Sequence, residues 1–141
     1  MTSIIEFLEA RIAEDEAAAR ACDVPAWSIR DEPDEHLWVE GLSIHAADSN
    51  WDACIAVADA RHAVRHNPAR VLAECAAKRA IMREHELDLG MREPYCDSCA
   101  EWWMSELGEG PPMVKYPCPT VKAVAAVYKD HPDYQQEWAI G

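Results

Sequence analysis

Basic residues are scarce in this chain, which has 13 lysines and arginines against 26 acidic residues and a formal net charge of −13. Proteins that bind the phosphate backbone of nucleic acids need clustered lysine and arginine. The composition therefore disfavours direct nucleic-acid binding. An acidic surface does attract basic partners, so a mimic of nucleic acid stays open as an alternative to a merely well-solvated surface.

Long apolar runs are also missing. No stretch is long and apolar enough to span a bilayer, and the first residues lack the basic start and apolar run of a signal peptide. We therefore expect a cytoplasmic protein with no membrane partner, whose six cysteines are reduced. A chain of 141 residues that is 50% hydrophobic is expected to form a single domain, residues 1–141, with a real core.

Several enzyme signatures are absent. The sequence contains no H-E-x-x-H, no G-x-S-x-G and no deaminase H-x-E with P-C-x-x-C. Only five glycines are present, which disfavours a glycine-rich loop that cradles phosphates. An enzyme of unknown reaction, such as a metal-dependent hydrolase, remains an alternative rather than the first reading.

The chain does contain a set of metal-ligand residues, in which Cys96-x-x-Cys99 is followed by Cys118 and preceded by His85. Zinc takes four ligands in a tetrahedron, and a C-x-x-C turn supplies two sulfurs to one ion. Proline is favoured at the first position of a helix, so Pro119 predicts that Cys118 is an N-cap. The helix dipole there favours the thiolate form that binds metal. The pattern predicts a structural zinc site within residues 85–120.

Three histidines are candidates for the fourth ligand of this site. His85 ends a predicted helix and is our first choice, His131 is the main rival and His66 is a distant third. Two other interpretations are a thioredoxin-like redox pair and simple free thiols. A redox pair needs a strand before it and a helix after it, whereas residues 90–95 look like a loop. Redox chemistry would also leave Cys118 unexplained.

The remaining patterns predict an α+β fold, mainly helical, with about four helices and a zinc-stapled loop region. Helices are expected over residues 3–21, 49–66, 68–85 and 119–128, and a small antiparallel meander within 26–48. Ser3 and Glu6 form a capping-box pattern. Tyr134 and Trp138 are expected to anchor the C-terminal segment on the body of the protein.

Trp102 and Trp103 are candidate binding residues. Consecutive residues of a helix point about 100° apart, so the two rings cannot easily enter one core. We expect Trp103 to pack inward beside Leu107, which leaves Trp102 near the Gly/Pro loop 108–112. Tryptophan is enriched at the hot spots of protein interfaces. This pair therefore indicates a protein partner.

The chain also resembles an uncharacterised family of small actinobacterial and actinophage proteins. The matching phrases are Phe7-Leu8-Glu9-Ala10-Arg11, Asp15-Glu16, Arg65-His66-Asn67-Pro68-Ala69-Arg70-Val71-Leu72, Ala77-Lys78-Arg79, His85, Cys96-x-x-Cys99, Pro117-Cys118-Pro119-Thr120 and His131-Pro132-Asp133-Tyr134. A histidine ahead of C-x-x-C and P-C-P-T is the family's pattern, so the resemblance supports His85 as a ligand. The longer insert between Cys99 and Cys118 departs from that pattern.

These observations give three functional hypotheses. The first is a small zinc-stabilised protein-interaction module, phage-encoded and acting on a host protein. The second is the enzyme of unknown reaction, and the third is the acidic mimic. The resemblance carries no assigned activity, and nothing in the sequence decides the oligomeric state.

Overall fold

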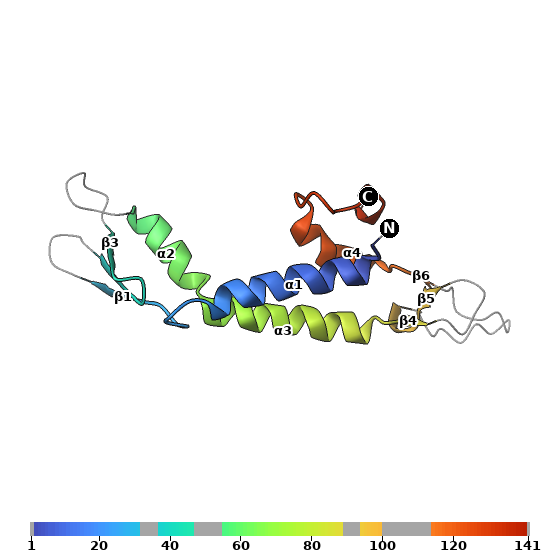
Figure 1. The fold of residues 1–141 in the computed structure, drawn as a ribbon, viewed down its shortest axis with the longest axis horizontal. Coiled ribbons are helices and arrows are strands. Elements are labelled where there is room, and N and C mark those ends of the chain that lie inside the picture. Colours follow the sequence, from blue (N-terminus) through green and yellow to red (C-terminus); the bar gives the residue numbers. More distant parts are fainter. Residues whose placement is uncertain (1, 32–36, 47–54, 89–93, 100–113, 141) are drawn as a thin grey trace, which may run out of the picture. The chain divides into compact units, whose positions relative to one another are not determined.

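The computed structural model describes residues 2–31, 37–46, 55–88, 94–99 and 114–140, and Figure 1 shows how they are arranged. The helices are α1 (Ile4–Arg20), α2 (Val57–Arg65), α3 (Pro68–Glu84) and α4 (Pro119–Ala125), and the strands are β1 (Ser28–Asp31), β2 (Leu37–Glu40), β3 (Ile44–Ala46), β4 (Leu87–Asp88), β5 (Tyr95–Cys96) and β6 (Val114–Lys115). Short 3-10 turns follow at 97–99, 126–128 and 136–138. The predicted α+β class, with four α-helices and a small antiparallel sheet, is confirmed over these residues.

The described residues fall into two compact units. One contains Met1–Ile12 and Ala76–Gly141, and the other contains Ala13–Cys75. Helices α1 and α3 each contribute residues to both units. The expectation of a single domain stays a prediction, and each unit is described below by itself.

Helix α1 begins where the capping-box pattern places it. The Ser3 N–H donates to a Glu6 carboxylate oxygen at 2.8 Å, and the Glu6 N–H donates to the Ser3 hydroxyl at 3.2 Å. The backbone bond from Ser3 is the main reason that the pKa of Glu6 lies below its ordinary value. Leu8 and Ile12, on the predicted apolar face, have no exposed surface.

The unit of residues 13–75 contains the predicted meander, with strand order β1-β2-β3. All neighbouring strands are antiparallel, with Val39 opposite Ile29 on one side and Ile44 on the other. Val39 and Ala60 of α2 are fully buried in the core of this unit. Helix α2 therefore covers one face of the sheet.

Helix α2 is shorter than predicted. The pattern at Ser49 predicted a start there, but Ile55 forms a parallel bridge with Ala46 and Ala56 is extended, with φ −69° and ψ 151°. The helix begins only at Val57. Pairing with the edge of the sheet holds residue 55 in an extended conformation, which a helix from residue 49 would forbid. Ser49 itself lies outside the described residues.

The C-terminal segment packs on α1, as predicted from Tyr134 and Trp138. The Phe7 ring lies at the centre of an aromatic cluster, with its centroid 5.0 Å from Trp138, 5.7 Å from His131, 6.1 Å from Tyr134 and 6.3 Å from Tyr128. Phe7 and Trp138 are 2% and 3% exposed. This cluster joins the start of α1 to residues 126–138.

A second three-stranded sheet, β4-β5-β6, was not predicted. Its strands are two residues each, with Cys96 of β5 paired to Leu87 on one side and Val114 on the other. The interpretation of residues 90–95 as a loop was wrong at its end, because Tyr95 begins β5. This small antiparallel sheet gathers three segments distant in sequence.

Membrane crossing has no support in the described helices. None of them combines the length and the apolar composition that a transmembrane segment requires.

Candidate metal centre

The end of α3 and the strand β5 position three of the candidate ligands. His85 directly follows α3, and its N–H still donates to the Ile81 carbonyl at 3.0 Å, so the last helical turn fixes its direction. Cys96 is the last residue of β5, and Cys99 closes the 3-10 turn that follows. The C-x-x-C pair therefore lies in one tight turn, as its spacing predicted.

Cys118 is the N-cap of α4, again as predicted. Its backbone is extended, with φ −70° and ψ 164°, and Pro119 is the first helical residue. The Lys122 N–H donates to the Cys118 carbonyl at 3.0 Å and closes the first turn. The Cys118 side chain caps no N–H group of its own helix, which leaves the sulfur available to bind a metal ion.

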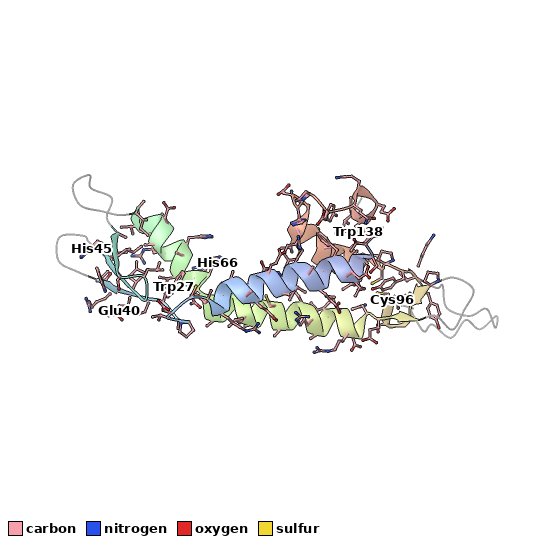
Figure 2. The ribbon with its side chains drawn as sticks, in the orientation of Figure 1. Trp27, Glu40, His45, His66, Cys96 and Trp138 are labelled. Atoms are coloured by element: carbon pink, nitrogen blue, oxygen red, sulfur yellow. The ribbon has the colours of Figure 1, made fainter. Side chains whose placement is uncertain are left out.

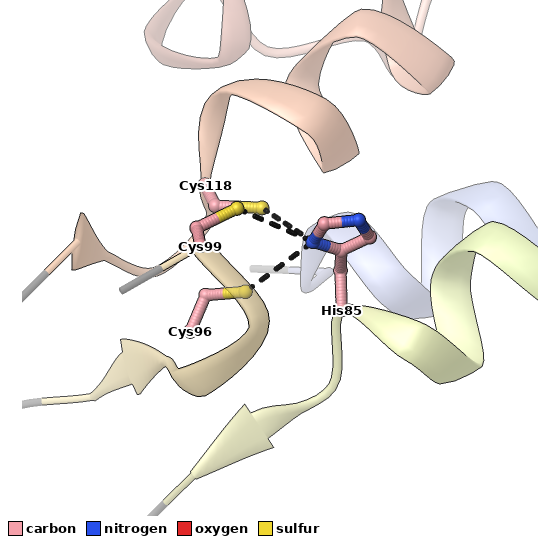
Figure 3. A group of neighbouring side chains, drawn as sticks. All are labelled: His85, Cys96, Cys99 and Cys118. Atoms are coloured by element: carbon pink, nitrogen blue, oxygen red, sulfur yellow. Dashed lines mark hydrogen bonds between the residues drawn. The ribbon is translucent and has the colours of Figure 1, made fainter. Parts of the chain in front are cut away.

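The four side chains converge on one point (Figure 3). His85 Nδ1 lies 3.2 Å from the Cys99 sulfur, 3.5 Å from the Cys96 sulfur and 3.9 Å from the Cys118 sulfur. All four ligand atoms lie within 4.8 Å of one another. One nitrogen in contact with three sulfurs from two other segments is the arrangement of a Cys3His metal site.

These distances match a zinc tetrahedron. Zn–S bonds of about 2.3 Å and Zn–N bonds of about 2.0–2.1 Å place nitrogen and sulfur ligands about 3.6 Å apart. The three nitrogen–sulfur separations, 3.2–3.9 Å, lie on both sides of that value. The residues therefore fit a tetrahedral ion without a large movement of the backbone.

Burial disfavours the thiolate form of Cys96. Cys96 and Cys118 are fully buried, while Cys99 and His85 are partly exposed. Burial is the main cause that raises the pKa of Cys96 to about 12. The backbone hydrogen bond from Cys99 opposes this shift, while the side chains of Cys99 and Cys118 add to it. A cation among the sulfurs would reverse this effect, because it stabilises the thiolate form.

Three supporting contacts were not predicted. The Ser98 hydroxyl donates to the Glu84 carbonyl and ties the C-x-x-C turn to the end of α3. The Thr120 hydroxyl lies 3.9 Å from the Cys99 sulfur, and the Tyr116 N–H donates to the Pro94 carbonyl at 3.0 Å. The signals for Thr120 were its place in the first turn of the helix that Cys118 caps and its place in the P-C-P-T phrase.

The rival histidines have other neighbours. His131 Nδ1 lies 3.1 Å from Arg11 Nη1 and accepts a hydrogen bond from the Asp133 N–H at 3.1 Å. His66 lies at the end of α2, with its ring centroid 4.5 Å from that of His62. Among the described residues, His85 is the histidine that joins the three cysteines. The other two predicted site residues, Trp102 and Trp103, lie outside the described residues.

The fold and the cluster together define a small α+β protein with a Cys3His group that could bind a metal ion. The chain belongs to a family of unknown function, DUF6221, whose model matches residues 1–140. No curated protein and no solved structure matches it.

Proposed function

We propose that this chain is a zinc-stabilised protein-interaction module of the cytoplasm. The observation that carries the proposal is the convergence of His85 Nδ1 and three cysteine sulfurs within 4.8 Å. Thiolate and imidazole ligands in a tetrahedron select zinc over magnesium and calcium, which prefer oxygen. Four protein ligands close the coordination sphere, whereas a catalytic zinc keeps a position open for water. The same feature disfavours the hydrolase alternative.

A protein partner is the best-supported role for a chain with this composition. The net charge of −13 repels nucleic acid and attracts basic proteins. Trp102 and Trp103 are adjacent in sequence, and the proposal assigns Trp102 to an exposed contact surface. Zinc would hold the fold that presents this surface.

The metal assignment predicts different effects for two histidines. His85→Ala removes one of four ligands, so its zinc content should fall below about half an ion per chain, against about one in the wild type. His131→Ala should keep its zinc. Metal analysis of protein purified without added zinc, together with a thiol assay, measures the difference.

Cys22→Ser is a suitable control, because Cys22 lies outside the cluster and its sulfur donates to the Ala18 carbonyl. It removes one thiol without touching the site. Equal zinc content in the wild type and in His85→Ala would move the fourth ligand elsewhere. A wild type with intact thiols and almost no zinc would exclude the site.

The interaction assignment predicts that Trp102→Ala loses a partner while it keeps its zinc and its melting temperature. Pull-downs from a host lysate with the wild type and the variant would compare their sets of bound proteins. Trp103→Ala should behave differently and lower the melting temperature, since its ring is assigned to the core. An unchanged set of partners in Trp102→Ala would count against the proposed surface.

A further inference from the structure

A groove of about 600 Å³ lies beside the metal centre, within the unit of residues 1–12 and 76–141. One wall is the start of α1, with Ile5 and Glu9, and the other is the end of α3. Tyr116 also lines the groove. Figure 1 shows the first turns of α1 beside the last turns of α3. The size is within the usual range of binding pockets.

The groove lies on the side of α1 that the C-terminal segment does not cover. Phe7 and Arg11 point toward that segment and contact Trp138 and His131. Ile5 and Glu9 precede these two residues by two positions, so they lie about 200° away around the helix. Residues 126–138, seen near Trp138 in Figure 2, therefore pack on one side of α1 and leave the groove on the other.

Apolar side chains contribute to both walls of the groove. Met82 is 7% exposed, whereas Leu87 is 41% exposed, a large value for leucine. Together with Ile5 they form an apolar part of the groove lining, contributed by α1, α3 and β4. Partner helices bind apolar grooves through their own apolar face.

Two carboxylates line the groove together with these apolar residues. Glu9 lies on the α1 wall, and Glu86 lies just beyond the end of α3. Both residues are exposed, and neither pairs with another described residue. Arg79 and Arg83 also line the α3 wall, so a basic group of the partner would be accepted beside Glu9 and Glu86 rather than midway along α3.

We propose that this groove is the docking site for a basic amphipathic helix of the partner protein. The apolar face of that helix would cover Ile5, Met82 and Leu87, and its lysines or arginines would pair with Glu9 and Glu86. The net charge of −13 would steer such a helix toward the surface. This inference rests on the proposed interaction function and gives it a location and a class of partner.

A bound metal ion would fix the positions of two parts of the groove lining. Glu86 and Leu87 directly follow the ligand His85, and Tyr116 lies two residues before the ligand Cys118. Zinc binding would therefore fix the groove as well as the fold. Removal of zinc should weaken docking even though no groove residue is itself a ligand.

The test uses a fluorescently labelled leucine–lysine peptide that forms an amphipathic helix, with zinc-loaded full-length protein at physiological salt. Binding is measured by fluorescence anisotropy. The double variant Glu9→Gln and Glu86→Gln should bind the peptide about tenfold more weakly. Leu87→Asn should also weaken binding by about tenfold, because it removes apolar contact and leaves the charge unchanged.

The matched control is Asp130→Asn with Glu137→Gln, which makes the same change in net charge at exposed positions outside the groove. It should bind the peptide like the wild type. An equal loss in both double variants would mean diffuse electrostatic attraction and would overturn the proposal. So would unchanged affinity in the groove variants, or equally tight binding of a leucine–glutamate peptide.

Zinc content and melting temperature of each variant separate the two levels of inference. If the groove variants keep their zinc content and melting temperature and bind the peptide as tightly as the wild type, the groove is excluded as the docking site. The proposal of a zinc-stabilised module then still stands. Wild-type protein that holds no zinc excludes the proposed function itself.

Discussion

Chelation of zinc is expected to lower the melting temperature by more than about 10 °C, the largest effect that we predict. Structural zinc contributes an apparent free energy of about 10–16 kcal/mol in zinc-finger peptides. Here the ligands come from three segments, and the strands that join them are two residues each. Strands this short do not form a stable sheet alone, so residues 85–99 and 114–120 should loosen first.

Circular dichroism melts with and without a strong chelator measure this effect, and amide hydrogen exchange locates it. Cys96→Ser should reproduce the chelated state in the absence of chelator. Cys75→Ser is a matched control, because Cys75 is also buried, at 1% exposure, but lies outside the cluster. A melting temperature that holds after chelation, while a catalytic activity disappears, would favour the enzyme hypothesis instead.

Phe7→Ala should cause the second largest loss, about 3–5 kcal/mol of unfolding free energy. The substitution empties the centre of a cluster of four aromatic neighbours and leaves a cavity among their rings. Phe7→Leu keeps most of the apolar volume and should cost much less. Denaturant unfolding monitored by tryptophan fluorescence gives both values.

A control on the same segment is Val127→Ala, since Val127 is 65% exposed. Its unfolding free energy should stay within about 0.5 kcal/mol of the wild type. Zinc content should be unchanged in all three variants, because Phe7 touches no ligand. A Phe7→Ala variant as stable as the wild type would mean that the C-terminal segment does not depend on this cluster.

Local sequence patterns predicted the features that depend on local chemistry. The Ser3–Glu6 capping box, the N-cap at Cys118 before Pro119 and the break at Asn67-Pro68 each rest on residues that are neighbours in the chain. The Asn67 side-chain oxygen does accept from the Arg70 N–H, at 3.1 Å. Helices α1, α3 and α4 therefore begin within a residue or two of the predicted positions.

Features that depend on distant pairing were missed. The strands β4 to β6 are too short to show an alternating pattern, and the start of α2 is set by the contact between Ile55 and Ala46. The choice between His85 and His131 depended on packing against Arg11 and Phe7, which no spacing reveals. The groove beside the metal centre could not be predicted from the sequence either, since α1 and α3 are far apart in sequence.

The aromatic cluster has a consequence for how the protein is made. Phe7 is synthesised early, but Tyr128, His131, Tyr134 and Trp138 complete its surroundings only at the end of the sequence. At about 5–20 residues per second, the ring waits on the order of ten seconds for these partners. During that time the apolar face of α1 is exposed on the nascent chain. The metal-ligand cluster is completed at the same late stage, because Cys118 also follows most of the chain.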